Sequence, residues 1–178
     1  MAREKTGLGN PPDEPVGIVS IFYISGMITL HRVAGTDPVF LQLTTLLDQD
    51  LALRDGPDHA FYAPFNATAA IRHAVVANAD GGPAGCGAFK PYDDHTAEIK
   101  RMYVLPDQRG KGIAAIVLKE LENWCRELGY TACQLETGKN QPEAIRLYQK
   151  TSYRQIDCYG QYKNIANSIC FAKSLALP

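Results

Sequence analysis

Along the chain, segments in which apolar and polar residues alternate are interspersed with segments in which apolar residues recur every three or four positions. Alternation is typical of half-buried strands, and the longer period is typical of amphipathic helices. The pattern predicts helices that begin at Pro38, Ile113 and Pro142 and end near residues 53, 128 and 150. It predicts strands at about residues 27–33, 71–79, 84–90, 97–105, 131–137, 153–159 and 167–173.

The residues at the ends of these segments agree with this interpretation. Asp37 followed by Pro38 suits the cap and the first position of a helix, and Gly129 suits a helix end. Runs of turn-forming residues at 80–83 and 93–95 separate the three central strands. The order of elements indicates a mixed α/β fold, in which an antiparallel meander is followed by a strand–helix–strand crossover.

Length and composition favour one folded domain. The chain has 178 residues, of which 46% are apolar and 21% charged, as in ordinary globular proteins. Residues 1–26 are expected to be an extension, partly disordered because its first part is rich in Gly, Pro and charge, and residues 27–178 the single domain. The apolar run at 16–30 is interrupted and too short to cross a bilayer, so no membrane association is expected.

Charge and cysteine content narrow the functional class. The 18 Lys and Arg residues nearly balance the 19 Asp and Glu residues, so no nucleic acid partner is expected. The five cysteines are odd in number and far apart, and they lack the spacing of zinc ligands. We interpret them as reduced, largely buried thiols, and we expect a cytoplasmic protein without a bound metal.

The run Arg109-Gly110-Lys111-Gly112-Ile113-Ala114 lies at the start of the expected second helix. A helix N-terminus presents unpaired N–H groups and the positive end of the macrodipole, and both attract phosphate. Glycine lets a phosphate oxygen approach the backbone closely. The run fits neither the P-loop nor the dinucleotide-binding pattern. The alternative is a glycine-bearing turn with two solvated basic residues.

Two motifs in order give this run a context. Residues 97–106 followed by 108–114 resemble the central motif of the GNAT superfamily of N-acetyltransferases, in which the loop has the pattern [QR]-x-x-G-x-[GA]. Residues 140–150 resemble a second motif of the family, N-x-x-A-x-x-L-Y-x-K. The chain departs from the family at Ser152, where the family usually has glycine.

The resemblance implies an α/β (α+β) fold with a mixed, mostly antiparallel sheet of about six or seven strands and about four helices. It implies transfer of an acetyl group from acetyl-CoA to a primary amine of a small molecule or peptide. Because no Ser or Cys lies in a recognisable nucleophile motif, we expect direct attack in a ternary complex rather than a covalent acetyl-cysteine route. The resemblance further implies a β-bulge near residues 102–104, with backbone groups that bind pantetheine and polarise the acyl carbonyl. The implied cofactor-binding residues are Met102, Tyr103, Val104, Arg109, Gly110, Lys111, Gly112, Ile113, Ala114 and Asn140.

Two residues are expected to move protons in this chemistry. An alkylammonium with a pKa near 10.4 is only about 0.04% neutral at pH 7, a deficit of roughly 4.6 kcal/mol, so a base is needed. The resemblance implies Glu98 as the base and Tyr148 as the acid that protonates the departing thiolate. Glu98 alternatively is a strand carboxylate paired with Lys100 or Arg101, and Tyr148 a core residue.

Some questions stay open from the sequence. Asn140 either contacts the pantetheine arm or caps the third helix. The loops at 54–66 and 159–167 are expected to shape the acceptor pocket, and they contain aromatic residues but no cluster of acidic ones. A homodimer is left open. The alternative function is a catalytically silent acyl-CoA sensor or interaction module.

Overall fold

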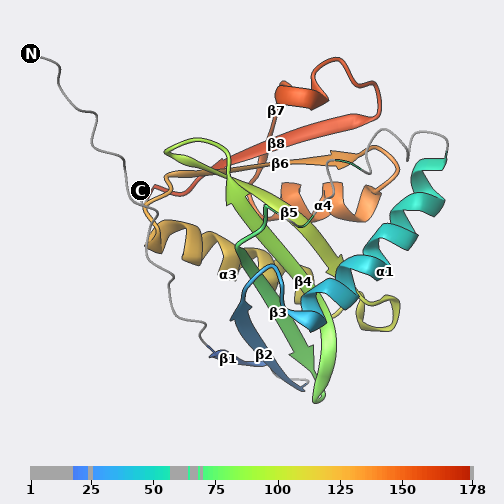
Figure 1. The fold of residues 1–178 in the computed structure, drawn as a ribbon, viewed down its shortest axis with the longest axis vertical. Helices are drawn as coiled ribbons and strands as arrows, with labels where there is room; N and C mark the ends of the chain where they lie inside the picture. The colour runs from blue at the N-terminus through green and yellow to red at the C-terminus, as the bar shows by residue number, and fades with distance from the viewer. Residues whose placement is uncertain (1–17, 24–25, 57–63, 65–67, 69, 177–178) are drawn as a thin grey trace, which may run out of the picture.

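A central sheet organises the computed structural model, which describes residues 18–23, 26–56, 64, 68 and 70–176 (Figure 1). Eight strands are arranged in the order β1-β2-β3-β4-β5-β6-β8-β7. Neighbouring strands are antiparallel, except that β5 and β6 run parallel. Their bounds are β1 Ile18–Tyr23, β2 Gly26–Val33, β3 His73–Ala79, β4 Gly82–Pro91, β5 Thr96–Val104, β6 Ala132–Gly138, β7 Arg154–Ile156 and β8 Ser168–Ser174.

The mixed, mostly antiparallel sheet is therefore confirmed, but the number of elements differs from the expectation. The sheet has eight strands rather than six or seven. The described residues form three α-helices rather than about four, namely α1 Pro38–Asp55, α3 Ile113–Glu127 and α4 Pro142–Lys150.

The additional strand is β1, which lies within the segment expected to be an extension. It pairs with β2 from Ile18 opposite His31 to Tyr23 opposite Gly26. Its sequence Ile-Val-Ser-Ile-Phe-Tyr is rich in β-branched and aromatic residues, and an edge strand such as β2 offers unpaired backbone groups for it. The sheet thus begins before residue 27. Residues 1–17 and 24–25 lie outside the described part of the chain.

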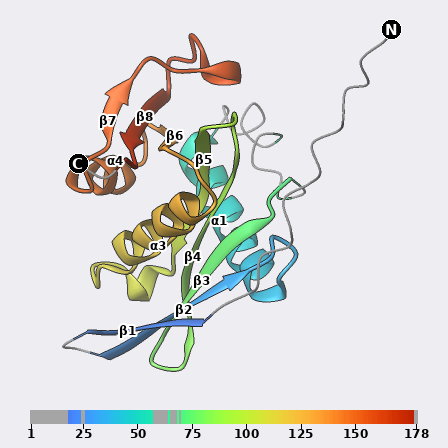
Figure 2. The same cartoon turned by 90° about the vertical axis from the view of Figure 1, so that its left-hand side faces the viewer.

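Helices cover both faces of the sheet. Figure 2 shows α1 on one face and α3 on the other. The Asp37 carboxylate accepts hydrogen bonds from the N–H groups of Val39 and Phe40, and Pro38 occupies the first turn, so the expected cap of α1 is confirmed. The helix α4 packs Tyr148 into the core that α3 covers. No helix within the described residues has the length and apolar character needed to span a membrane.

Apolar side chains fix the middle strands from both sides. On the α3 side, Val75, Phe89 and Ile99 belong to the same core as Val117 and Leu121 of α3. On the α1 side, Phe40, Leu43 and Leu47 of α1 share a core with residues of β3, β4 and β5. The strand β5 is thus packed on both faces. It also forms one wall of the candidate site.

The interpretation of all five cysteines as free thiols is wrong for two of them. Cys158 and Cys170 form a disulfide, with their Cα atoms 5.1 Å apart. In the sheet Ile156 of β7 lies opposite Cys170 of β8, and the chain after β7 brings Cys158 beside it. Because this contact depends on strand register, spacing along the sequence does not reveal it. The other three cysteines are free and buried.

The loop expected at 54–66 and the departure from the family at Ser152 can be compared with the structure. The loop expected at 54–66 is described only at 54–56 and 64, so most of it lies outside the described residues. Ser152, where the family usually has glycine, has a φ of 70°. A non-glycine residue in this left-handed region costs about 1–2 kcal/mol, which explains the preference for glycine after α4.

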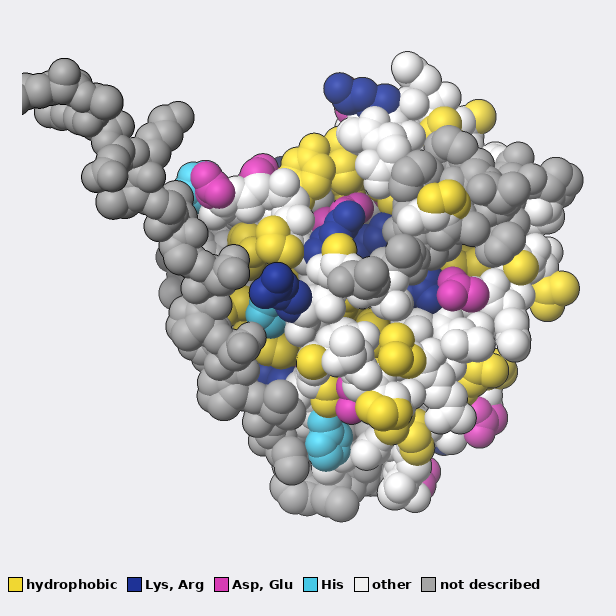
Figure 3. Space-filling view, viewed as in Figure 1, with side chains coloured by type: hydrophobic (Ala, Val, Ile, Leu, Met, Phe, Trp, Pro, Cys, Tyr) yellow, Lys and Arg dark blue, Asp and Glu magenta, His cyan; other side chains and the backbone are white. Residues whose placement is uncertain are grey.

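On the face shown in Figure 3, basic and acidic side chains lie interspersed.

Candidate active site

A cavity opens where the parallel strands β5 and β6 separate. They pair only through Thr96–Ala132, Ala97–Cys133 and Glu98–Gln134, and after Glu98 the strand β5 pairs with β4 alone. The cavity has a volume of about 370 Å³. Residues of β5 and β6, the C-terminal half of α1, the N-terminus of α3 and the helix α4 line it. This arrangement exposes one edge of the β5 backbone to the cavity, so an extended ligand can pair with it as an added strand does.

A β-bulge in β5 contributes to the separation of the strands. Ala88 lies opposite Lys100 and Cys86 opposite Tyr103, so Arg101 and Met102 together face the single residue Gly87. A Cβ atom at Gly87 would come within 2.4 Å of the Met102 Sδ, which explains the glycine. The expected bulge is therefore present, and it begins at Arg101 rather than within residues 102–104. Met102, Tyr103 and Val104 line the cavity as expected.

Arg101 has an unusual backbone conformation, with a φ of 59°. Left-handed non-glycine residues carry strain, of order 1–3 kcal/mol, that the surroundings must offset. Here Nη1 donates to Asp48 Oδ1 at 2.8 Å and Nη2 donates to the Thr44 carbonyl at 2.8 Å. Both partners belong to α1, so the buried guanidinium ties the bulge to the helix that lines the opposite wall of the cavity.

The glycine-bearing run forms the start of α3. Gly110 and Gly112 have φ values of 81° and 80°, which only glycine adopts without strain. A Cβ at either position would meet open space, so this backbone faces solvent or cavity rather than protein. Gly112 is the N-cap of α3, and no side chain caps the first turn. Its N–H groups are thus available to an anion.

The side chains of the run have different positions. Arg109, Gly110, Gly112, Ile113 and Ala114 line the cavity. Lys111 is not among the lining residues, and its Nζ donates to Gln108 Oε1 at 2.8 Å.

Arg109 is held at the cavity wall by two partners. Its Nη2 donates to Asp50 Oδ2 at 3.2 Å, and its Nε donates to the Val104 carbonyl at 3.1 Å. Asp50 belongs to α1 and itself lines the cavity. The guanidinium is therefore placed for a ligand phosphate, and the Asp50 carboxylate partly balances its charge.

Tyr148 of α4 is both a core residue and a lining residue of the cavity. Its ring lies 5.7 Å from the Tyr153 ring and 5.9 Å from the Phe171 ring. Burial raises its pKa well above the ordinary value, and the Glu136 carboxylate raises it further. The phenol therefore keeps its proton at neutral pH, as a proton donor must. The two interpretations of Tyr148 are compatible, because the same ring does both.

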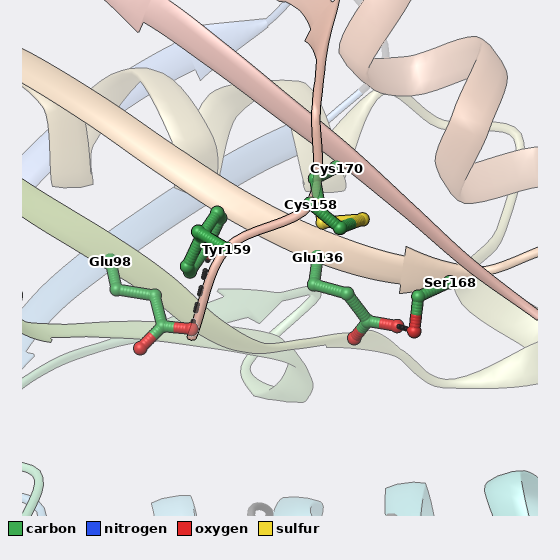
Figure 4. The surroundings of a disulfide bond; sticks show 6 residues. All are labelled: Glu98, Glu136, Cys158, Tyr159, Ser168 and Cys170. Carbon is green, nitrogen blue, oxygen red and sulfur yellow. Dashed lines mark hydrogen bonds between the residues drawn. A yellow bond between two sulfur atoms is a disulfide. The ribbon is translucent and has the colours of Figure 1, made fainter. Parts of the chain in front are cut away.

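Glu98 lies beside the cavity but does not line it. Its side chain is only 2% exposed, and it forms ion pairs with Lys90 Nζ at 3.1 Å and Lys100 Nζ at 3.8 Å. The Tyr159 hydroxyl donates to Glu98 Oε1 at 3.2 Å (Figure 4). The alternative of an ion pair with Lys100 is thus present, whereas Arg101 pairs with Asp48 instead. The assignment of Glu98 as base stays a prediction.

Two residues that sequence reasoning did not select line the cavity next to the last pair between β5 and β6. Glu136 of β6 accepts a hydrogen bond from Ser168 Oγ at 2.6 Å, and Lys100 of β5 donates from Nζ to the Tyr162 hydroxyl at 2.9 Å. Burial lowers the pKa of Lys100, and the Glu98 and Glu136 carboxylates oppose this effect. The one charged residue in the β6 sequence Ala-Cys-Gln-Leu-Glu-Thr-Gly was the available signal for Glu136.

Asn140 does not cap α4, and its expected contact with the pantetheine arm stays a prediction. Its Nδ2 donates to the Arg54 carbonyl at 3.1 Å, and it is not among the residues that line the cavity. The N-cap of α4 is Gln141 rather than Asn140, and no side chain caps this helix. Asn140 therefore links the end of α1 to the segment before α4. Within the described residues, no group of three or more His, Cys, Asp or Glu side chains is arranged for a metal.

Solved structures of similar fold are numerous. A candidate acyl-CoA N-acyltransferase from Klebsiella pneumoniae superposes with a TM-score of 0.67 and 26% identity, over 90% of this chain and 98% of that one. A GNAT family acetyltransferase from Elizabethkingia anophelis, whose structure has acetyl-CoA bound, superposes with a TM-score of 0.60 and 20% identity, over 83% and 97% of the two chains.

Curated relatives match by sequence over part of their length. An IAA acetyltransferase of Azospirillum brasilense is 36% identical over 89 residues, which are 49% of this chain and 58% of that protein. An uncharacterized N-acetyltransferase of Escherichia coli is 30% identical over 114 residues, 62% of this chain and 60% of that protein. The chain thus spans a little over half the length of these relatives.

A family model supplies the assignment. The model of the acetyltransferase (GNAT) family matches residues 41–153, which extend from α1 to the end of α4 and include β5, the glycine-bearing run and β6. Since this match covers more than half of the chain, and the fold agrees with it, the chain belongs to the GNAT acetyltransferase family.

Proposed function

We propose that this protein transfers an acetyl group from acetyl-CoA to a primary amine of a small molecule or peptide, by direct attack in a ternary complex. The observation that carries the proposal is the cavity between the diverging strands, which extends from the N-terminus of α3 to Tyr148 and Glu136. When bound, acetyl-CoA supplies a thioester carbonyl that an amine can attack.

The residues present fit this ligand. The N–H groups at the start of α3 and the Arg109 guanidinium suit the diphosphate, with Gly110 and Gly112 open to it. The exposed edge of β5 at Met102–Val104 suits the amide groups of the pantetheine arm. These positions are among the expected cofactor-binding residues. The Lys111 side chain donates to Gln108 and that of Asn140 to the Arg54 carbonyl, and their expected role in binding the cofactor stays a prediction.

Removal of the amine proton is assigned to a carboxylate next to the point where β5 and β6 separate. Glu98 is the sequence-based candidate, but two lysines and a tyrosine surround it and it does not line the cavity. Glu136 does line the cavity. A base must lie within hydrogen-bond reach of the proton, directly or through one water. We therefore assign the proton transfer to Glu136, and Glu98 stays the sequence-based alternative for the base.

Tyr148 is the proposed proton donor to the departing thiolate. Its ring lines the cavity, and its pKa is raised by burial, so it is protonated when the sulfur leaves. The Tyr148→Phe variant keeps the ring and removes the proton. Tyr153→Phe is a matched control, because Tyr153 is a buried neighbour in the same core that does not line the cavity.

The test is thiol release from acetyl-CoA in the presence of a panel of primary amines, with acetyl-CoA binding followed by calorimetry. We expect turnover with at least one amine, a rate about 10²-fold lower for Tyr148→Phe with unchanged acetyl-CoA binding, and little change for Tyr153→Phe. Binding without thiol release for every amine would favour the silent sensor. The cytoplasmic location stays a prediction, and a homodimer stays open.

A further inference from the structure

Next to the last pair between β5 and β6, the cavity brings together one ammonium and one carboxylate. Glu98 and Gln134 form the last pair between β5 and β6, and Lys100 and Glu136 each lie two residues further along the two strands. Side chains two residues apart in a strand share a face of the sheet. Figure 4 shows the Glu98 and Glu136 side chains pointing to the same side. Lys100 and Glu136 therefore form opposite walls of the cavity where the strands meet.

Lys100 shares the Glu98 carboxylate with a second lysine, Lys90. The Glu98 carboxylate faces two ammonium groups, Lys90 at 3.1 Å and Lys100 at 3.8 Å, and it also accepts a hydrogen bond from Tyr159. Lys90 is the nearer and more exposed of the two, with 32% of its side chain accessible against 11% for Lys100. One positive charge of this group is left over, on the side of the cavity where Lys100 lies.

Glu136 provides the complementary negative charge. It belongs to the opposite strand, receives the Ser168 hydroxyl, and is close enough to Lys100 to act on it electrostatically. A ligand that carries a positive and a negative group a few ångströms apart matches this pair, whereas a simple alkylamine matches only Glu136. Hydrogen bonds between charged groups are among the strongest available in a site of this kind.

We propose that the acceptor is an amine with a carboxylate next to its nitrogen, as in an α-amino acid, with its nitrogen at Glu136 and its carboxylate at Lys100. This inference rests on the proposed acetyl transfer. The substrate ammonium gives one proton to Glu136, a C–N bond forms to the acetyl carbon, and the C–S bond breaks. Tyr148 protonates the sulfur, the second nitrogen proton restores the Tyr148 phenol, and Glu136 releases its proton to solvent, so the products are an N-acetyl amino acid, coenzyme A and one proton.

The Lys100 side chain is largely buried. A buried ammonium is costly unless negative groups compensate for its lost hydration. Lys100 donates to the Tyr162 hydroxyl at 2.9 Å, and the Glu98 and Glu136 carboxylates stabilise its charge from a greater distance. A bound carboxylate in direct contact would add to this compensation, whereas an acceptor without one would not. The acceptor carboxylate should therefore lower the acceptor KM more than it raises kcat.

The first experiment needs no variant. Each of the common L-amino acids is tested as acceptor, and the best is compared with its carboxamide and with the amine that lacks the carboxyl group. We expect kcat/KM to fall about 10- to 100-fold for the carboxamide and the decarboxylated amine, mainly through KM. Equal or better turnover of the decarboxylated amine would overturn the inference and leave the acetyl transfer intact. Failure of every amine would count against the acetyl transfer itself.

Two variants test whether Lys100 is the residue that recognises the acceptor carboxylate. Lys100→Met should lose about 10- to 100-fold in kcat/KM for the amino acid and little for the carboxamide, and Lys100→Arg should restore part of the loss. Lys90→Met is the matched control, since it removes a cation from the same Glu98 carboxylate but does not line the cavity. An equal loss in Lys90→Met, or an equal loss for both acceptors in Lys100→Met, would contradict the assignment. Thermal unfolding checks that both variants fold.

Discussion

The two ends of the cavity are built in different ways. The phosphate end consists of backbone from one continuous run, 109–114, at the start of one helix. The reactive end consists of side chains from β5, β6 and α4, surrounded by residues of the segment between β7 and β8. The first depends on local conformation, the second on contacts between distant parts of the chain. Substitutions at the two ends should therefore have separable effects on binding and on turnover.

The largest expected effect is at the reactive end. Glu136→Gln should lower kcat/KM by about 10²- to 10⁴-fold at neutral pH, because it removes the proposed proton acceptor while keeping the shape of the side chain. Glu98→Gln, whose carboxylate does not line the cavity, should have a smaller effect. Steady-state kinetics over a range of pH, with acetyl-CoA affinity as control, provide the measurement. A larger loss in Glu98→Gln would return the role of base to Glu98.

Removal of the disulfide tests whether the reactive end depends on the segment between β7 and β8 that surrounds it. Cys158 directly precedes Tyr159, whose hydroxyl contacts Glu98, and its bond to Cys170 closes a loop with a sequence separation of 12. Replacing both cysteines with serine should lower the free energy of unfolding by about 2–3 kcal/mol. Turnover should fall as well, whereas acetyl-CoA affinity should hold.

The control for this experiment is chemical. A dithiol reductant should bring the parent protein to the stability of the double variant and leave the double variant unchanged. If denaturant unfolding gives equal stabilities for the two proteins under oxidising conditions, the disulfide does not stabilise this segment.

The phosphate end can be disturbed by a single methyl group. Gly112→Ala forces an alanine into a φ of 80°, at a cost of about 1–2 kcal/mol, and should weaken acetyl-CoA binding about 10-fold through a shift of the loop. Gly129→Ala is a matched control at the other end of α3, with a φ of 89° and open space around it. Calorimetry should show similar losses of stability in both variants but weaker binding only in Gly112→Ala.

The smallest expected effect concerns the partner of Arg109. Asp50→Asn removes the carboxylate that pairs with Arg109 at 3.2 Å and would compete with a ligand phosphate. Since exposed ion pairs contribute about 0–1 kcal/mol, acetyl-CoA binding should tighten by no more than about 5-fold, most clearly at low salt. Asp48→Asn, which faces Arg101 instead, should give no such tightening. Weaker binding in Asp50→Asn would mean that the carboxylate supports the loop.

Local sequence signals predicted the elements that they control. Asp37-Pro38 fixed the start of α1, and the apolar period and Gly129 fixed the extent of α3, because capping and helical periodicity act within a few residues. The strand β1 was missed because its pairing with β2 depends on a partner edge rather than on its own composition alone. The run at 109–114 was predicted correctly as a helix N-terminus for the same local reason.

The sequence by itself determined the mixed fold, the family motifs and the phosphate end, since each depends on neighbours along the chain. Only the tertiary structure decided that Glu98 is enclosed by Lys90, Lys100 and Tyr159, that Cys158 meets Cys170, and that Glu136 and Lys100 line the cavity. These contacts join β4, β5, β6 and the segment between β7 and β8, and they arise from strand order and register. The order of the strands, and the point at which β5 and β6 separate, therefore determine which side chains meet at the reactive end. The spacing of residues along the sequence does not contain this information.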